Sequence, residues 1–232
     1  MSVTLNGATQ VDKRIRLTPE ILDYVLTCTE QPVPVQQWLI DATTALGQVA
    51  EMQVAHEQAV LFTLLAAASK AHRIVEVGTF TGYSALAFAR GMPAEGVIDT
   101  YDITDKWSST ARRAWQEAGF ADRIRQHIGP AADLLDQLPP EPAVGLVFID
   151  ADKVSYIRYW EQLVPRVVDN GLIIADNVLY AGEATSVHAE GNAAAIRTFN
   201  EHVRADDRVQ AVMLPLADGL TIARKLPAGY RR

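Results

Sequence analysis

The segment from Arg73 to Ser84 constrains the fold of this chain more than any other. An apolar, β-type run ends at Gly78, and a run of helix-forming residues begins after Gly82. This pattern predicts a strand, a tight turn and the N-terminus of a helix. Free backbone N–H groups and the positive end of the helix dipole suit a polar or anionic ligand at such a turn. Glu76, near the end of the strand, would add a carboxylate to the same crevice.

The turn does not have the glycine spacing of a dinucleotide-binding protein. Phe80 stands where the Gly-x-Gly-x-x-Gly pattern has its middle glycine, which lets a pyrophosphate approach the backbone. We therefore expect a ligand without phosphates rather than NAD or FAD. The turn alone is also compatible with an ordinary strand–helix connection that binds nothing, so its context decides.

That context predicts an α/β fold with a Rossmann-like, doubly wound, mostly parallel seven-stranded sheet. Short apolar strands alternate with helices, a pattern typical of a parallel sheet with helices on both faces. Strands are expected at 73–78, 97–102, 124–128, 144–149, 171–175, 208–214 and 219–224. Helices are expected between them at 83–91, 106–118, 131–137, 154–168 and 189–205. Only about four residues join the last two strands, so this pair is antiparallel, since parallel neighbours need a much longer connection.

The first 50 residues predict a helical N-terminal extension within a single domain spanning 1–232. Residues 1–16 are polar without a clear period and are expected to form a loose arm. Helices are expected to follow at 18–29, 35–46 and 57–70. Cys28 is the only cysteine, which excludes a disulfide framework and a thiolate metal cluster. It lies in an apolar helical pattern, so we expect it to be buried.

Charge and hydropathy exclude several other classes of protein. The formal net charge is −7 and no stretch forms a basic stripe, which argues against binding to nucleic acid or to an anionic membrane. No stretch reaches the roughly 18 apolar residues of a membrane-spanning helix. Residues 1–16 lack the apolar core of a signal peptide. A cytoplasmic location is the expectation that follows.

Carboxylates follow four of the first five predicted strands. Parallel strands place their carboxyl ends at one edge of the sheet, so we expect Glu76, Asp102, Asp150 and Asp176 to meet in one crevice. Asp102 ends the second strand, where an acid commonly hydrogen-bonds the ribose hydroxyls of a nucleoside. Asp99 is the competing acid, but it lies inside the strand pattern and is expected at its start or facing solvent.

Asp150, Asp176 and Asn177 form a candidate metal site. Two carboxylates and an amide oxygen from neighbouring strand ends suit Mg²⁺ or another hard divalent cation. Helix capping and a simple turn would explain the same residues without a metal. Lys153 lies beside them and could act as a base if its proton affinity were lowered, although most lysines are solvated surface charges.

Four motifs together resemble one enzyme family. They are Glu76-Val-Gly-Thr-Phe-Thr-Gly-Tyr-Ser84, Phe148-Ile-Asp-Ala-Asp-Lys153-x-x-Tyr156, Asp176-Asn-Val-Leu179 and Asp218-Gly-Leu-Thr221. The chain resembles the cation-dependent class I S-adenosylmethionine O-methyltransferases of the caffeoyl-CoA O-methyltransferase-like family, with catechol O-methyltransferase a more distant relative. The resemblance runs from about Val35 to Lys225. It departs from the family at Thr104, at 169–171 and at Ala217, none of which is a metal position.

The resemblance implies an active site with S-adenosylmethionine and Mg²⁺ or another divalent cation. The implied cofactor residues are Val54, Glu76, Gly78, Thr79, Ser84, Asp102, Ala131 and Asp150. Asp150, Asp176 and Asn177 match the metal ligands, and Lys153 matches the residue proposed as general base. Residues 56–59 are a looser match to the segment of the family that lines the cofactor entrance. Residues 179–192 and the front helices with Trp38 are the expected walls for the acceptor, a small molecule with a hydroxyl group, with a catechol-like phenol as the leading candidate.

The sequence leaves two alternative functions open and also predicts an oligomeric state. A tRNA hydroxyuridine methyltransferase could share the scaffold, although the net charge of −7 argues against it. A nucleotide-dependent dehydrogenase or a non-catalytic binder is disfavoured by Phe80 and by the antiparallel ending. We expect a homodimer, since the apolar front helices have no evident place on a sheet whose faces are already covered.

Overall fold

The computed structural model describes residues 2–5, 8–11 and 15–230 of the chain. They separate into two compact units, Met1–Gln31 and Pro32–Arg232. The boundary differs from the predicted 1–50 extension, and the interpretation of the whole chain as a single domain stays a prediction.

The first unit contains a hairpin and one helix. Strands β1 (Ser2–Leu5) and β2 (Ala8–Val11) pair in antiparallel register. The expectation of a loose arm is therefore wrong for these strands, because backbone pairing orders even a polar segment; residues 1, 6–7 and 12–14 of that arm lie outside the described residues. Helix α1 (Pro19–Cys28) begins with Thr18, whose hydroxyl accepts a hydrogen bond from the Ile21 N–H at 3.4 Å.

Cys28 at the end of α1 is exposed, which contradicts the prediction that it is buried. No residue of α1 is buried. The apolar pattern indicated a helix correctly, but this unit has no second helix among its described residues to cover the apolar side. A helical period therefore does not guarantee burial.

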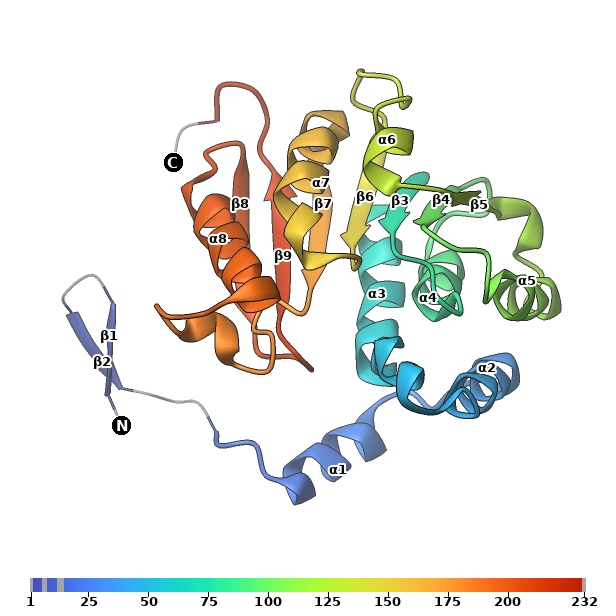
Figure 1. The fold of residues 1–232 in the computed structure, drawn as a ribbon, viewed down its shortest axis with the longest axis horizontal. Helices are drawn as coiled ribbons and strands as arrows, with labels where there is room; N and C mark the ends of the chain where they lie inside the picture. The colour runs from blue at the N-terminus through green and yellow to red at the C-terminus, as the bar shows by residue number, and fades with distance from the viewer. Residues whose placement is uncertain (1, 6–7, 12–14, 231–232) are drawn as a thin grey trace. The chain divides into compact units, whose positions relative to one another are not determined.

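The second unit is built on a seven-stranded sheet, as predicted. Its order is β5-β4-β3-β6-β7-β9-β8 (Figure 1). The strands are β3 (Arg73–Val77), β4 (Val97–Asp102), β5 (Ile124–Ile128), β6 (Val144–Ile149), β7 (Val167–Asp176), β8 (Val209–Leu214) and β9 (Leu220–Lys225). Strand β9 is antiparallel to both neighbours, and the other neighbouring pairs are parallel.

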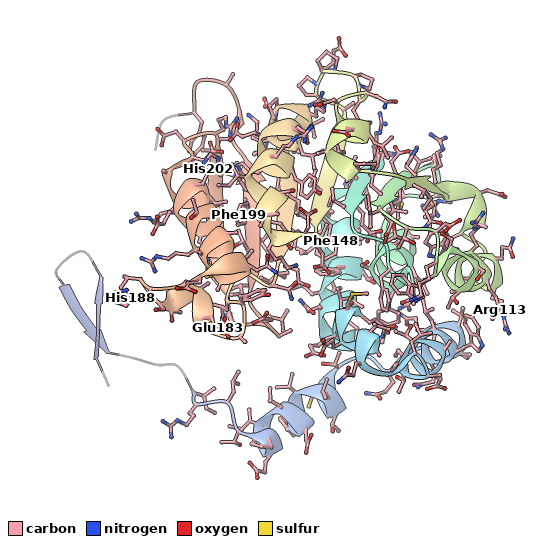
Figure 2. All side chains as sticks on the ribbon, in the orientation of Figure 1. Arg113, Phe148, Glu183, His188, Phe199 and His202 are labelled. Atoms are coloured by element: carbon pink, nitrogen blue, oxygen red, sulfur yellow. The ribbon has the colours of Figure 1, made fainter. Side chains whose placement is uncertain are left out.

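Helices cover both faces of this sheet, and Figure 1 shows α7 and α8 in front of it. The helices of the unit are α2 (Pro34–Thr44), α3 (His56–Ser69), α4 (Tyr83–Gly91), α5 (Ser108–Glu117), α6 (Ala131–Leu135), α7 (Tyr156–Leu163) and α8 (Gly191–Ala205). Successive residues of β6 alternate between two buried clusters, one with α3 to α5 and one with α6 to α8. Phe148 belongs to the first cluster and Phe199 of α8 to the second (Figure 2).

The predicted helix 154–168 is too long at its C-terminus. Helix α7 ends at Leu163, a 3₁₀ turn spans Val164–Arg166, and β7 already begins at Val167. Pro165 explains the difference, because proline has no N–H and cannot continue an α-helix beyond its first turn.

Helices α2 and α3 have places in the core, contrary to the expectation that the front helices lack one. Leu39 of α2 and Phe62 of α3 are fully buried in the same cluster. Trp38 lies under the Arg113 guanidinium of α5, with 4.2 Å between the guanidinium carbon and the ring centroid. The premise from which the homodimer was predicted therefore holds for neither helix.

Asp99 is also placed differently from the prediction. It is 3% exposed, inside β4 rather than facing solvent. Arg73 of β3 donates two hydrogen bonds to its carboxylate at 3.1 and 3.2 Å, and His127 of β5 lies 3.0 Å away. Partners on both neighbouring strands make a buried carboxylate tolerable.

Candidate active site

The carboxyl ends of the parallel strands open into one cavity of about 1190 Å³. Ten of the eleven predicted site residues line it: Val54, Gly78, Thr79, Ser84, Asp102, Ala131, Asp150, Lys153, Asp176 and Asn177. Glu76, the eleventh, is fully buried beside it. The structure therefore brings the predicted set together, while the roles of the individual residues stay predictions.

The turn after β3 forms the floor of the cavity. Gly78 has a φ of +100° and Gly82, the N-cap of α4, has a φ of +81°, so both occupy backbone conformations that favour glycine. Phe80 between them also has a positive φ, of 48°. Its ring packs edge-on against Trp107, another residue of the cavity wall, with 4.8 Å between centroids. A strained non-glycine residue of this kind is a common feature of functional sites.

Asp102 holds this turn in shape. Its Oδ2 accepts hydrogen bonds from the N–H groups of Thr79 and Phe80 at 3.1 and 2.8 Å, and its Oδ1 accepts one from Thr104 at 3.0 Å. Oδ2 therefore uses both of its lone pairs on the turn, whereas Oδ1 can accept one further hydrogen bond. Asp102 can therefore serve both the turn and the hydroxyl groups of a ligand.

Glu76 is an acid enclosed beside the turn. Its Oε2 accepts a hydrogen bond from the Thr100 hydroxyl at 2.5 Å, and that hydroxyl lies 2.6 Å from the hydroxyl of Thr79. Burial raises the pKa of Glu76 to about 8, against the opposing influence of the Ser84 and Thr100 hydroxyls. Its Oε1 has no hydrogen-bond partner among the described residues. A protonated carboxyl at this point can donate a hydrogen bond.

Lys153 connects the ends of β6 and β7. Its Nζ donates hydrogen bonds to Oδ1 of Asp150 at 3.1 Å, to Oδ1 of Asn177 at 2.6 Å and to the Tyr156 hydroxyl at 2.7 Å. The Tyr156 hydroxyl in turn donates to the backbone carbonyl of Asp176 at 3.2 Å. Burial and the nearby carboxylates of Asp150 and Asp176 raise the pKa of Tyr156 well above its usual value, so it stays a neutral phenol.

Asp176 is the buried carboxylate of the group and is 2% exposed. Burial and the charge of Asp150 raise its pKa, whereas hydrogen bonds from the Asn177 N–H and the Gln58 amide oppose the rise. The Asn177 N–H donates to Oδ1 at 2.7 Å, and Gln58 Nε2 donates to both oxygens at 3.0 and 3.1 Å. Asn177 itself has a positive φ of 54°.

These residues fit a divalent cation. Oxygens of Asp150 and Asn177 already converge on one positive charge, the Lys153 ammonium, and Asp176 adds a second carboxylate nearby. Two carboxylates and an amide oxygen are the donor set of a hard divalent cation. Asp152, the other acid of the segment, instead accepts hydrogen bonds from Ser155 and Tyr159.

The same floor fits a polar organic cofactor. The unpartnered Oε1 of Glu76 offers a hydrogen bond at the turn, and Asp102 offers carboxylate oxygens. The backbone of Gly78 packs against the Asp150 carbonyl, with which a side chain at position 78 would collide. Gly78 also lines the cavity, so its backbone forms part of the cavity floor.

The two expected walls for the acceptor have different outcomes in the structure. Tyr180, from the predicted wall 179–192, lines the cavity, whereas Trp38 packs against α5 instead. Gln58, which contacts Asp176, was not among the predicted site residues. The available signal was its position three residues after Ala55, the N-cap of α3, where a glutamine oxygen can accept the N-cap N–H.

A second group of side chains of the types that bind metal ions lies outside the cavity. Glu161, His202 and Asp206 offer atoms within 4.8 Å of one another. The Arg208 guanidinium donates to the carboxylates of both Glu161 and Asp206, with the shortest distances 2.6 and 2.7 Å. Arg208 therefore supplies the positive charge in this cluster.

The chain is similar to known methyltransferases. The family model described as O-methyltransferase matches residues 29–226. The probable caffeoyl-CoA O-methyltransferase 1 of Dictyostelium discoideum is 34% identical over 223 residues, covering 94% of this chain and 97% of that protein. Caffeoyl-CoA O-methyltransferase 1 of Eucalyptus globulus is 35% identical over 166 residues, covering 67% of this chain and 68% of that protein.

Solved structures agree with these sequence relatives. A crystal structure described as a putative O-methyltransferase from Klebsiella pneumoniae has a TM-score of 0.83 at 30% identity, covering 90% of this chain and 97% of that one. The O-methyltransferase from Bacillus cereus, in complex with SAH, has a TM-score of 0.81 at 28% identity, with coverages of 89% and 97%. TomG from Streptomyces achromogenes, in complex with SAM, has a TM-score of 0.82 at 26% identity, with coverages of 90% and 96%. None of the helices within the described residues has the length and apolar character needed to span a membrane.

Proposed function

The chain belongs to the O-methyltransferase family and is an S-adenosylmethionine-dependent O-methyltransferase; we propose that it acts with a divalent cation on a small molecule with vicinal hydroxyl groups. Mg²⁺ is the cation that we expect, and a catechol-like phenol is the acceptor. The observation that carries this proposal is the convergence of the Asp150 and Asn177 oxygens on one positive charge, inside the cavity floored by Gly78.

The residues of the chain divide into two groups of roles. Asp102, Glu76 and the turn around Gly78 and Thr79 would bind and orient S-adenosylmethionine, together with Val54, Ser84 and Ala131. Asp150, Asp176 and Asn177 would hold the cation. When bound, the cation would supply a positive charge that stabilises a deprotonated acceptor hydroxyl, and S-adenosylmethionine would supply the methyl group.

Lys153 is the proposed proton acceptor. All three N–H bonds of its ammonium have acceptors in the structure, on Asp150, Asn177 and Tyr156. Cation binding by Asp150 and Asn177 would remove two of these acceptors. Nζ would take the proton of the acceptor hydroxyl only as a neutral amine, so the ammonium would first give up one of its protons to solvent. Positioning both reactants in this cavity could lower the barrier by about 7–11 kcal/mol.

The decisive experiment is a methyl-transfer assay. Catechols, flavonoids and hydroxylated amino acids are offered with labelled S-adenosylmethionine, in metal-free buffer, with EDTA, and after Mg²⁺ is restored. We expect transfer to a vicinal diol only when Mg²⁺ is present. Full activity without a divalent cation would refute the metal assignment and leave simple acid–base chemistry.

Substitutions sharpen this assay. Asp150→Ala and Asp176→Ala should abolish turnover while the fold, checked by circular dichroism, stays intact. Asp152→Ala is the matched control: Asp152 lies in the same segment and lines the cavity, but its carboxylate is engaged by Ser155 and Tyr159. It should keep its dependence on Mg²⁺.

Three further predictions belong to this proposal. Because α2 and α3 pack in the core, the homodimer is now expected from the family resemblance alone. Light scattering tests it, since a mass near 25.4 kDa would indicate a monomer. A cytoplasmic location is also expected. Nucleic acid is not expected as a partner. A gel shift with bulk tRNA tests this, because binding would favour the tRNA hydroxyuridine methyltransferase alternative over a small-molecule acceptor.

A further inference from the structure

Gln58 is a buried side chain that connects the start of helix α3 with Asp176. It is 2% exposed and lines the cavity. Its Oε1 accepts the Ala55 N–H at 3.0 Å, which caps the N-terminus of α3. Its Nε2 donates to both oxygens of Asp176, 118 residues further along the chain, at 3.0 and 3.1 Å.

The two contacts fix the orientation of the Gln58 amide. A flipped amide would place its oxygen against the Asp176 carboxylate and its NH₂ group against the Ala55 N–H. Neither pairing forms a hydrogen bond, since a carboxylate accepts and an N–H donates. The N–H donor therefore faces Asp176, and the capping contact holds it there.

We propose that Gln58 is a positioning residue that orients the Asp176 carboxylate for a divalent cation. The amide is neutral, so it fixes the carboxylate without neutralising the charge that attracts a cation, as a lysine or arginine there would. The Asn177 N–H is the only other donor to the Asp176 carboxylate among the described residues, and it contacts Oδ1 alone. Gln58 is thus the only donor among the described residues that contacts both oxygens, and it fixes the rotation of the Asp176 carboxylate group. This inference rests on the proposed function.

The test is metal affinity, measured without turnover. Gln58→Met keeps the length of the side chain and removes the amide. Manganese binding, followed by electron paramagnetic resonance, and Mg²⁺ binding, followed by calorimetry, should weaken about 10- to 100-fold, the usual loss when a ligand loses its supporting hydrogen bond. Affinity for S-adenosylhomocysteine in metal-free buffer should stay at the wild-type value.

The chain offers a matched control in Gln36. This glutamine is fully buried, and its Oε1 accepts the Val33 N–H at 3.2 Å, which caps the N-terminus of α2. It also accepts a hydrogen bond from Arg90, but it does not line the cavity. Gln36→Met removes the same kind of cap and should leave metal affinity unchanged. Equal losses in the two variants would show a general effect on stability and overturn the proposal.

A measurement on the wild-type protein covers the case in which Gln58→Met does not fold. The side-chain amide resonances of Gln58 in an NMR spectrum should shift as Mg²⁺ is added, and those of Gln36 should not. Unshifted Gln58 resonances at saturating Mg²⁺ would overturn the proposal.

The outcomes separate this inference from the proposed function. Wild-type protein that binds neither Mg²⁺ nor Mn²⁺ would refute the proposed metal site, and the positioning role would be refuted with it. Wild-type protein that binds Mg²⁺, with Gln58→Met binding it equally well, would refute the positioning role alone. In activity assays the Mg²⁺ concentration for half-maximal rate should rise in Gln58→Met, while kcat at saturating Mg²⁺ changes less.

Discussion

The backbone of Gly78 lies directly against the carbonyl oxygen of Asp150. A Cβ at Gly78 would come within 1.8 Å of that oxygen and 2.8 Å of its carbon. The two residues follow the adjacent strands β3 and β6, and the Asp150 N–H donates to the Val77 carbonyl at 2.8 Å. Because this hydrogen bond holds the Asp150 backbone in place, only glycine fits at position 78.

Gly78→Ala should therefore destabilise the protein and disrupt the cavity floor. A positive φ and an unavoidable backbone collision together should lower the free energy of unfolding by at least about 2 kcal/mol. Chemical denaturation measures this loss, and calorimetry should show that binding of S-adenosylhomocysteine is lost. Gly119→Ala is the control, with a φ of +76° and nothing within 4 Å of the added Cβ, so it should lose only about 1–2 kcal/mol. Equal losses in both variants would contradict the steric argument.

Asp102→Ala should weaken binding of S-adenosylhomocysteine. Hydrogen bonds to a charged group contribute about 1–3 kcal/mol, so the dissociation constant should rise roughly 5- to 150-fold. Calorimetry measures it. Asp105→Ala, at an exposed acid outside the cavity, is the control and should bind normally. Unchanged affinity in Asp102→Ala would remove this residue from the cofactor site.

The sheet could be predicted from the sequence because its signals are local. Strands β3 and β6 and the second half of β7 are mostly apolar runs that end at glycine or an acid, and the residues of each run specify the strand without distant partners. The four-residue connection at 215–218 was enough to predict the antiparallel β9. Convergence of Asp102, Asp150 and Asp176 in one cavity followed from the geometry of parallel strands.

The features that were mispredicted depend on distant partners. Asp99 was expected at the strand start or facing solvent because its partners, Arg73 and His127, lie on the neighbouring strands and far from it in the sequence. Gln58, in the loosely matched segment 56–59, was missed as a contact of Asp176, because nothing near it in the sequence indicates that contact. Cys28 has an apolar helical neighbourhood, but its exposure depends on whether another element covers the helix. Periodicity describes one element and carries no information about what packs on it.

Glu76 should make the stability of the ligand-free protein depend on pH. Burial raises its pKa from the ordinary 4.5 to about 8, so between these values the folded protein holds a proton that the unfolded chain has lost. The folded state then binds more protons, and the contribution of Glu76 to the free energy of unfolding falls as the pH rises from about 4.5 to about 8. Glu76→Gln, a neutral isostere, should remove this decline.

Thermal denaturation of both proteins at a series of pH values tests this prediction. The melting temperature of the wild-type protein, relative to that of Glu76→Gln, should decrease between pH 5 and 8 by the linkage argument above. A constant difference across this range would show that the Glu76 carboxyl is ionised in the folded state. The same series with S-adenosylhomocysteine reports whether the ligand changes that ionisation.

Arg208 should stabilise the junction of α7, α8 and β8 through Asp206. Its guanidinium donates to Asp206 at 2.7 to 3.1 Å and to Glu161 at 2.6 and 3.0 Å, and the Asp206 side chain is only 5% exposed. Arg208→Met should lower the free energy of unfolding by about 1–2 kcal/mol at pH 7, since the arginine itself is partly exposed. Arg197→Met, which removes an ion pair of 3.3 Å with the exposed Glu201, is the control and should lose less than about 1 kcal/mol.

The pH dependence distinguishes this ion pair from simple packing. Burial alone would raise the pKa of Asp206, but hydrogen bonds from Arg208 and Trp160 outweigh it and lower the pKa from the ordinary 3.8 to about 2. The stabilisation is therefore complete above about pH 4 and is lost as the pH falls through about 2, where the folded carboxylate takes up its proton. The difference in unfolding free energy between wild type and Arg208→Met, measured by urea denaturation, should shrink over that window. A difference that stays constant down to pH 2 would mean that Arg208 contributes packing rather than charge.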